Sequence, residues 1–286
     1  MKIVKTQSAV IEEINSIKSQ NKTIGFVPTM GALHQGHLSL IKKATAENDI
    51  CIASIFVNPT QFNNPDDLKN YPRTLENDCQ ILENEGCTLV FAPTAEEIYT
   101  NAETENTFVF DFQGLDKVME GIFRQNHFNG VVQIVSKLFE LIKPDRAYFG
   151  EKDFQQLAII RLMTKTLKFP VEIVGCPIVR EQSGLAMSSR NELLTENERV
   201  IAAHINAVLK ESAVFALETS VAELKQAVIS AINQKSELEV EYFEIVDGNT
   251  LQPLENWNDT EYAIGCVTVY CGKVRLIDNV FYKKYF

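Results

Sequence analysis

The sequence of 286 residues lacks both of the common glycine patterns for nucleotide binding. It has no G-x-x-x-x-G-K-[ST] stretch, which would predict a P-loop, and no G-x-G-x-x-G stretch, which would predict a dinucleotide fold. It has no apolar run long enough to span a bilayer and no apolar signal region near its N-terminus. These absences argue against both common nucleotide folds and predict a cytoplasmic protein that makes no use of a membrane.

Histidine is scarce, with four residues, and the cysteines show no metal-binding spacing. The six cysteines form no C-x-x-C pair, so we interpret them as free thiols in a reducing cytosol. The formal charge of −11 argues against a nucleic-acid partner, which usually requires a basic face. It does not exclude a small anionic ligand, because local positive groups can outweigh the global field.

The first half of the chain alternates strands with helices. Apolar runs at 22–29, 50–57 and 88–91 predict strands, and two more are expected at 147–149 and 171–174. Helical patterns alternate with these strands, and the first of them, which precedes the strand at 22–29, has Ser8 as a candidate N-cap. Such alternation predicts an α/β fold with a mostly parallel sheet covered by helices on both faces.

The second half has a different pattern. Thr195 with Glu198, and Ser220 with Glu223, are the capping boxes of two predicted helices. Three strand-like runs follow at 238–246, 262–270 and 274–277. The sequence therefore predicts two domains, an α/β domain over residues 1–177 and a smaller α+β domain with an antiparallel sheet over residues 178–286.

The most informative stretch is the segment 24–37, a predicted buried strand followed by a turn and the start of a helix. Backbone N–H groups and the helix dipole favour anions at such a turn. His34 and His37 lie there, two of only four histidines in the chain, with Gly36 between them. One capping histidine and one surface histidine would be the simpler interpretation. The setting favours imidazoles that donate to a phosphate.

Three other stretches suit small polar ligands. Gly150–Asp153 joins a strand to a helix and offers Lys152 to a phosphate, although a solvated lysine is the alternative. Met187–Asn191 offers two hydroxyls and a guanidinium, or simply a helix cap. In Asn58–Phe62, Asn58 and Gln61 can hydrogen-bond a small polar substrate without adding charge, with a structural turn as the alternative. Asp78 and Glu83 are expected on a solvated acidic face.

Together these motifs resemble those of the pantothenate synthetase (pantoate–β-alanine ligase) family. The matching stretches are PTMGALHQGH at 28–37, NPTQF at 58–62, GEKDFQQ at 150–156 and MSSRN at 187–191. The H-x-G-H element alone marks a wider nucleotidyltransferase superfamily that includes some aminoacyl-tRNA synthetases. The four motifs in this order are far more specific, and they extend from about residue 24 to residue 195.

The resemblance implies an ATP-dependent ligase with a Rossmann-like N-terminal domain and a C-terminal lid domain. Such enzymes use Mg²⁺, form homodimers and condense (R)-pantoate with β-alanine, giving pantothenate, AMP and pyrophosphate through a pantoyl adenylate. The resemblance assigns catalysis to His37, and substrate binding to Gln61 and Gln156. The motifs themselves add His34 and Lys152 as catalytic donors to phosphate, and Asn58 as a further contact of pantoate or β-alanine. The resemblance assigns no Mg²⁺ ligands. The residues implied for ATP binding are Met30, Gly31, Ala32, Leu33, His34, Gln35, Gly36, His37, Gly150, Glu151, Lys152, Asp153, Val179, Met187, Ser188, Ser189 and Arg190.

One stretch departs from the family pattern. The family usually has Arg-Pro-Gly-His-Phe where this chain has Arg-Gln-Asn-His-Phe at 124–128. The Pro-Gly turn is lost, which leaves the shape of this loop and the role of Arg124 open.

Two rival functions remain at this point. A plain nucleotidyltransferase would move AMP onto a phosphate-bearing acceptor and would need extra basic groups at the acceptor site. The uncharged Asn58, Gln61 and Gln156 favour a small acid instead. A non-catalytic module would bind the nucleotide without turnover.

Overall fold

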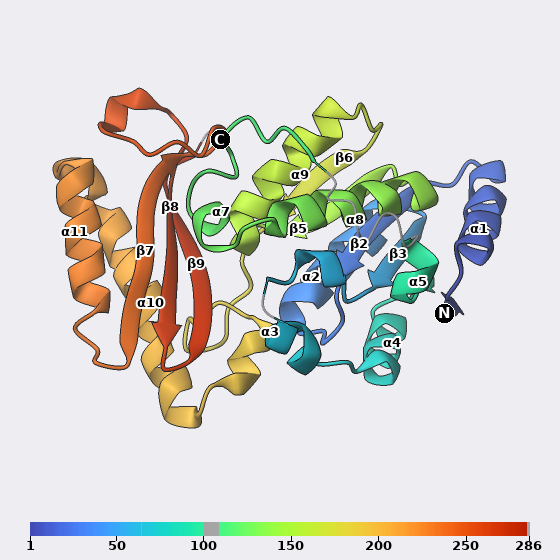
Figure 1. Ribbon diagram of the computed structural model, residues 1–286, viewed down its shortest axis with the longest axis horizontal. Helices are drawn as coiled ribbons and strands as arrows, with labels where there is room; N and C mark the ends of the chain where they lie inside the picture. Colours follow the sequence, from blue (N-terminus) through green and yellow to red (C-terminus); the bar gives the residue numbers. More distant parts are fainter. Residues whose placement is uncertain (64, 100–108, 285–286) are drawn as a thin grey trace. The chain divides into compact units, whose positions relative to one another are not determined.

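The computed structural model describes residues 1–63, 65–99 and 109–284, whose chain is coloured from blue to red in Figure 1. They form two compact units. The first contains Met1–Phe112, Phe123–Glu151 and Ile159–Cys176, and the second contains Gln113–Ile122, Lys152–Ala158 and Pro177–Phe286. The division at residues 177/178 stays a prediction about domain organisation. Two segments that precede it, 113–122 and 152–158, belong to the second unit.

The first unit is built on a six-stranded sheet with the strand order β1-β4-β3-β2-β5-β6. Every neighbouring pair is parallel, which confirms the predicted α/β sheet. Strand β3 is buried along nearly its whole length, as expected when helices cover both faces. The strands are β1 (Lys2–Val4), β2 (Ile24–Thr29), β3 (Ile50–Ile55), β4 (Leu89–Phe91), β5 (Arg146–Gly150) and β6 (Glu172–Cys176).

Successive residues of β2 contact helices on opposite faces of this sheet. Val27 packs in a cluster with Ile41 of α2 and Leu82 of α4. Phe26 meets Phe139 of α8 with ring centroids 6.4 Å apart, and α8 packs against α1. The helices of this unit are α1 (Gln7–Ser19), α2 (Gln35–Glu47), α3 (Pro65–Asn70), α4 (Leu75–Asn84), α5 (Ala95–Ile98) and α8 (His127–Ile142); α9 (Phe154–Thr166) begins in the second unit and ends in the first.

The N-terminal segment differs from the sequence prediction. Residues Lys2–Val4 form β1, which pairs with β4 at one end of the sheet and was not predicted as a strand. Helix α1 begins at Gln7, and its N-cap is Thr6, whose hydroxyl accepts the N–H of Ala9 at 3.3 Å. The predicted cap at Ser8 is therefore wrong. Both hydroxyls suit an N-cap, so the sequence alone does not distinguish them.

The strand order places the carboxyl end of β2 at a topological switch point. The chain runs from β2 to β3 on one side, whereas β5 pairs with β2 on the other side. Ligands of open parallel sheets bind outside the carboxyl ends of strands where the order reverses. The segment that follows Thr29 is therefore the first place to look for a site.

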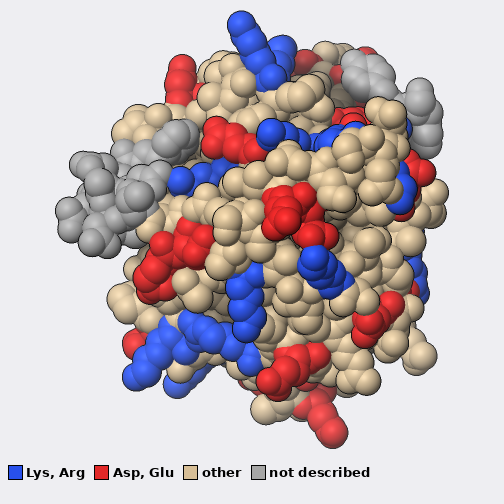
Figure 2. Space-filling view, turned by 90° about the vertical axis from the view of Figure 1, so that its right-hand side faces the viewer, with Lys and Arg blue, Asp and Glu red and all other residues tan. Residues whose placement is uncertain are grey.

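The surface carries charges of both signs. Figure 2 shows one face, on which groups of Lys and Arg side chains alternate with groups of Asp and Glu side chains. This mixture fits the net charge of −11 and the ordinary charged content of 23%.

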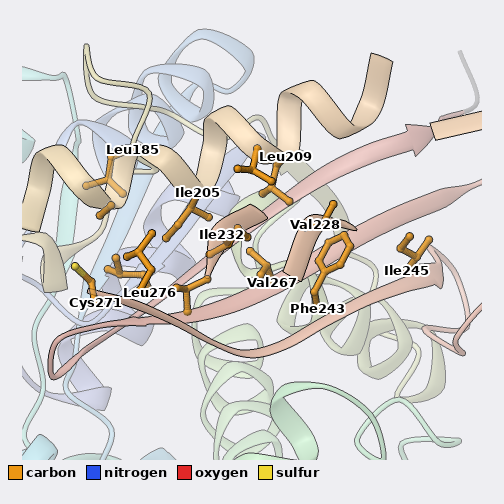
Figure 3. Close-up of a cluster of buried hydrophobic side chains, with 14 of the residues drawn as sticks. Leu185, Ile205, Leu209, Val228, Ile232, Phe243, Ile245, Val267, Cys271 and Leu276 are labelled. Atoms are coloured by element: carbon orange, nitrogen blue, oxygen red, sulfur yellow. The ribbon is translucent and has the colours of Figure 1, made fainter. Parts of the chain in front are cut away.

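The second unit is a three-stranded antiparallel sheet, β7 (Leu238–Asp247), β8 (Ala263–Cys271) and β9 (Val274–Lys283), which confirms the predicted sheet. Helices α10 (Glu196–Phe215) and α11 (Val221–Ile232) cover one face. Figure 3 shows Leu209 of α10 and Val228 of α11 beside Phe243 and Val267 of the strands. Burying a side chain of this size stabilises the fold by about 1.5–3 kcal/mol.

Capping boxes start both helices as predicted. The Thr195 hydroxyl accepts the Glu198 N–H at 3.2 Å, and the Ser220 hydroxyl accepts the Glu223 N–H at 3.3 Å. Each glutamate accepts the N–H of its N-cap residue in return.

A buried ion pair attaches the segment 113–122 to the opposite face of the sheet. Glu120 begins the short helix α7 (Glu120–Phe123), and its carboxylate accepts two hydrogen bonds from Arg275 of β9, at 2.7 and 2.9 Å. Tyr242 and Thr268 donate to the same carboxylate. Burial, together with the Glu120 charge, raises the pKa of Tyr242, so its hydroxyl stays protonated and donates.

One stretch, Glu196–Glu218, meets the length and apolarity of a membrane-spanning helix, with a mean hydropathy of 1.5. In the structure, Ile205 and Leu209 of this stretch belong to the apolar cluster of the second unit. The core helix of a globular unit has the same composition.

All six cysteines are free and buried.

Candidate active site

The turn between β2 and α2 is held by one glycine and one buried carboxylate. Gly31 has φ +83°, and a Cβ there would lie 3.0 Å from Oδ2 of Asp78. Asp78 accepts the backbone N–H of Ala32 at 3.0 Å and that of Leu33 at 2.9 Å. Glycine is thus required both by the left-handed conformation and by the close approach of Asp78.

The structure contradicts the expectation that Asp78 lies on a solvated acidic face. Its side chain is completely buried, and Thr74, the N-cap of α4, also donates to it at 3.1 Å. Glu83, further along the same helix, has an exposed side chain, as expected. The burial of Asp78 could not be predicted from the sequence, because the N–H groups that it accepts lie about 45 positions away in the chain.

His34 and His37 are brought together at the N-terminus of α2. Nδ1 of His34 accepts the N–H of Gly36 at 3.1 Å, and Nδ1 of His37 accepts the N–H of His34 at 3.3 Å. The two rings lie with centroids 4.2 Å apart. Because each Nδ1 is an acceptor, a neutral ring carries its proton on Nε2. The turn therefore presents two imidazole N–H donors and the positive end of a helix, a combination suited to phosphate oxygens.

The Asn58–Gln61 turn lies beside this segment. It forms η1 (Pro59–Gln61) after β3, and Nε2 of Gln61 is 2.7 Å from Sδ of Met30. Asn58 is buried, and its amide bonds the Gly130 carbonyl at 3.0 Å and the Tyr99 hydroxyl at 2.8 Å. The structure thus places Gln61 next to the β2–α2 turn, whereas the contacts of Asn58 are those of a structural turn.

The segment from Lys152 to Ala158, which follows β5 and Glu151, lies in the second unit. Lys152 is in η2 (Glu151–Asp153), and its ammonium donates to Asp153 at 3.2 Å. Asn279 of β9 donates to the Lys152 carbonyl at 3.1 Å. Gln155 is buried and bonds the carbonyls of Leu115 and Val118, whereas its neighbour Gln156 is partly exposed.

The Met187–Arg190 segment follows a short, closed loop of the second unit. Met187 donates its N–H to the Val179 carbonyl at 3.0 Å, and the backbone groups of Arg180 and Ala186 form an isolated bridge. Ser188 caps η3 (Ser189–Leu193) by accepting the Arg190 N–H at 3.3 Å. The cap predicted for this segment as an alternative is therefore present, and Ser189 and Arg190 begin the helix.

The residues of the motifs thus form local groups in each unit. In the first unit, the structure brings His34, His37, Met30 and Gln61 to the carboxyl ends of β2 and β3. In the second, two residues of β9 hold these segments. Asn279 bonds the backbone of Lys152, and Asp278 bonds Arg180 in the Val179–Arg190 arm. In residues 1–63, 65–99 and 109–284, no three His, Cys, Asp or Glu side chains group together to hold a metal ion.

Comparison with known proteins decides the family. The family model described as pantoate-beta-alanine ligase matches residues 2–281 of this chain. The chain belongs to the pantoate–β-alanine ligase family. It is an enzyme, and its reaction is the ligation of pantoate to β-alanine, as the sequence motifs predicted.

Similar proteins agree along the whole chain. A pantothenate synthetase of Phocaeicola vulgatus is 57% identical, over 99% of this chain and 100% of its own length. A pantothenate synthetase of Bacteroides fragilis is 55% identical over the same shares. The solved structure of the Thermus thermophilus enzyme has a TM-score of 0.91 and 41% identity, covering 99% of this chain and 100% of that one. The Francisella tularensis pantoate-beta-alanine ligase, solved with beta-gamma ATP and beta-alanine, has a TM-score of 0.82 and 37% identity, covering 100% and 99%.

The departure from the ligase pattern at 124–128 has a simple structural outcome. Asn126, which stands where the family usually has glycine, adopts φ +61° and is the N-cap position of α8. Asparagine is the residue other than glycine that tolerates the left-handed region best. The turn therefore forms without Pro-Gly, and Nδ1 of His127 lies 2.8 Å from the Gln61 carbonyl.

Proposed function

We propose that this ligase activates pantoate with ATP and forms a pantoyl adenylate. The observation that carries the proposal is the pair of imidazole rings of His34 and His37 at the N-terminus of α2. An anion site of this kind suits a triphosphate. The Francisella tularensis relative, solved with an ATP species and β-alanine, supports the same choice of substrates.

In the first step a carboxylate oxygen of pantoate attacks the α-phosphorus of ATP. The bond to the bridging oxygen breaks, and pyrophosphate leaves. In the second step the β-alanine amine attacks the acyl carbon of the adenylate, AMP leaves with the former carboxylate oxygen, and the amine loses a proton. No protein nucleophile is needed, so positioning and charge stabilisation provide the catalysis.

We assign His34, His37 and Lys152 to the charge that develops on the phosphates. Nε2–H of each histidine and the Lys152 ammonium are donors that strengthen as the phosphate oxygens gain charge. We assign the rest of the ATP contacts to Met30, Gly31, Ala32, Leu33, Gln35, Gly36, Gly150, Glu151, Asp153, Val179, Met187, Ser188, Ser189 and Arg190.

We assign the binding of pantoate and β-alanine to Gln61 and Gln156, whose amides add no charge beside a carboxylate. Asn58 contributes to this binding through Gln61. Its buried amide ties the β3–η1 junction to α8, which fixes the turn from which Gln61 projects.

Mg²⁺ would enter this site with the nucleotide. The donor set fits that role, because Mg²⁺ binds through substrate phosphates, water and one or two carboxylates. Asp78 does not fit, since both of its oxygens accept backbone N–H groups. Asp153, half exposed beside Lys152, is the carboxylate that we assign to the ion. When bound, the ion would neutralise phosphate charge.

We also propose that the enzyme is a cytoplasmic homodimer. The family resemblance supports the dimer, and six buried free thiols suit a reducing compartment. Sedimentation analysis of the purified chain at micromolar concentration tests the dimer, which a monomer mass would refute.

Pantoate-dependent exchange of labelled pyrophosphate into ATP, without β-alanine, tests the adenylate. An adenylate intermediate requires exchange that depends on pantoate alone. Binding of ATP and pantoate with no exchange until β-alanine is added would refute an adenylate that forms before the amine arrives.

A further inference from the structure

Strand β9 carries two successive polar residues that are almost completely buried. Asp278 is 5% exposed and Asn279 is 4% exposed. Neighbouring residues of a strand project from opposite faces of a sheet. Leu276, two positions before Asp278, packs in the cluster under α10 and α11, and Phe281, two after Asn279, contacts Phe154 edge to face on the other side. The side chain of Asp278 therefore lies on the face of the sheet that α10 and α11 cover, and the side chain of Asn279 lies on the opposite face.

Asp278 holds the arm that carries the Met187–Arg190 segment. Its carboxylate accepts two hydrogen bonds from Arg180, at 2.7 and 2.9 Å. Arg180 also donates to the Gly184 carbonyl at 3.2 Å, across the loop that this arm makes. A bidentate guanidinium–carboxylate pair fixes both distance and orientation. Val179 and Met187, which pair next to Arg180, thereby have a fixed place relative to β9.

Asn279 holds the other segment. Its amide donates to the carbonyl of Lys152 at 3.1 Å. Phe154 packs on Phe281 with ring centroids 5.9 Å apart, which ties the next residues of the segment to the same strand. The backbone of Lys152 is thus positioned by a side chain that is 127 residues away in the sequence.

We infer that Asp278 and Asn279 are positioning residues for ATP, which set the separation between Lys152 and the Ser188–Arg190 segment through one rigid strand. The inference rests on the proposed assignment of these two segments to ATP. Neither residue needs to touch the nucleotide. A misplacement of about 1 Å in a site that works by positioning lowers the rate by up to about 100-fold.

Two variants of similar shape test this role in the full-length enzyme. Asn279→Leu removes the donor to Lys152, and Asp278→Asn removes the charge that orients Arg180. Each is expected to lower kcat/KM for ATP in pantoate-dependent exchange by about 10- to 100-fold. KM for β-alanine in the complete reaction is expected to stay the same. The matched control is Tyr282→Phe on the same strand, which removes the hydroxyl that bonds Ser212 at 2.8 Å without touching either segment.

The control separates positioning from general stability. Tyr282→Phe is expected to lower Tm with unchanged kinetics for ATP. The double variant Arg180→Gln with Asp278→Asn provides a second measurement if Asp278→Asn alone does not fold, because it removes both charges of the pair. If Arg180 and Asp278 act as a unit, the double variant should lose no more of the kcat/KM for ATP than the worse of the two single variants, Arg180→Gln and Asp278→Asn.

Lys152→Ala and Arg190→Ala serve as references. If both keep wild-type kinetics for ATP, the assignment of these segments to ATP is wrong. If both lose activity while Asn279→Leu, Asp278→Asn and the double variant keep the wild-type kcat/KM for ATP, the positioning role is overturned.

Discussion

Asp78 shows how a single residue organises the turn that precedes α2. Its carboxylate has no solvent contact, and each of its two oxygens accepts a backbone N–H from the turn. Asparagine has nearly the same shape but only one such acceptor. In Asp78→Asn, an amide N–H group must therefore face a backbone N–H group in a buried place.

We expect Asp78→Asn to lower the free energy of unfolding by about 1–3 kcal/mol, the usual cost of a buried unpaired donor. Urea denaturation measures the loss. Glu76→Gln, at an exposed position in the first turn of the same helix, is the matched control and should change stability by less than about 0.5 kcal/mol. Equal stability of the two variants would show that Asp78 does not hold the turn.

His37 has two separate jobs that a pair of variants can distinguish. Nδ1 accepts the N–H of His34, and we assign Nε2–H to phosphate. His37→Asn keeps an acceptor near the position of Nδ1 but has no group at the position of Nε2. We expect both His37→Ala and His37→Asn to slow adenylate formation by roughly 10²–10³-fold.

Single-turnover formation of pantoyl adenylate measures this step. His204→Ala removes a histidine of α10 that bonds the Ala231 carbonyl, and its rate should equal that of the wild type. A normal rate in His37→Asn would assign the histidine to the structure of the turn alone.

The residues at this turn also show what the sequence could predict. His34 and His37 were found because strand, turn and helix follow one another within 14 residues of 24–37. Asp78 and the contacts of Asn58 were not, because they depend on partners 45 and 72 residues away. A single sequence records local order directly, but it records distant contacts only through the fold.

At the scale of elements, α8 and η1 approach each other so closely that only glycine fits between them. A Cβ on Gly130 would lie 2.5 Å from the Thr60 carbonyl oxygen and 2.7 Å from the Gln61 nitrogen. These neighbours are backbone atoms, so they cannot rotate away. Any side chain at this position must push η1 away from α8.

We expect Gly130→Ala to raise KM for pantoate by about 10-fold or more, because it displaces Gln61 by a distance of the order that costs tenfold or more in positioned catalysis. Steady-state kinetics with varied pantoate measure the change. Ser136→Ala, on the same helix, removes a hydroxyl that bonds carbonyls of its own helix and should leave KM unchanged. An unchanged KM in Gly130→Ala would show that η1 does not position the substrate.

Asp145 ties the start of β2 to α1 and gives the first unit a pH dependence. Partial burial favours its protonated form, but hydrogen bonds from Lys18 and from the Ile24 N–H outweigh burial and lower the pKa of Asp145 below its ordinary value of 3.8. A lowered pKa in the folded state stabilises the protein above the unfolded pKa, and this stability is lost as the pH falls through the folded pKa.

Asp145→Asn should therefore be less stable than the wild type at pH 7, and the difference should shrink below about pH 4. Denaturation at a series of pH values measures it. A difference that stays constant from pH 7 to pH 3 would mean that the Asp145 charge does not tie these elements together.

Long elements with local signals were predicted, among them the capped helices α10 and α11 and the three strands β7–β9, although β9 continues to Lys283 beyond the predicted end at residue 277. The three-residue strand β1 was missed because it begins with an exposed lysine and an exposed isoleucine, so it lacks the continuous apolar run that marks the equally short β4. Its existence depends on the edge of β4, which the sequence of β1 itself does not contain.

At the scale of the whole molecule, the second unit is assembled from three separate stretches of chain. Glu120, from 113–122, pairs with Arg275, and Phe154, from 152–158, packs on Phe281. Both partners of each contact are needed to cover this face of the sheet. A sequence pattern suggests a division at one point, and it contains no sign that earlier segments return to the later unit.

A fragment of residues 178–286 should therefore lack a cooperative thermal transition. Without Glu120, Arg275 loses one of the two carboxylates that it pairs with and keeps Glu241; breaking a buried pair costs about 3–5 kcal/mol, out of a total stability of about 5–15 kcal/mol. Loss of the Phe154 contact adds to this. Calorimetry of the fragment tests the prediction, and a sharp transition would show that the C-terminal residues fold alone. In the full chain, Glu120→Gln should lower Tm more than Glu244→Gln, which breaks the more exposed pair with Lys225.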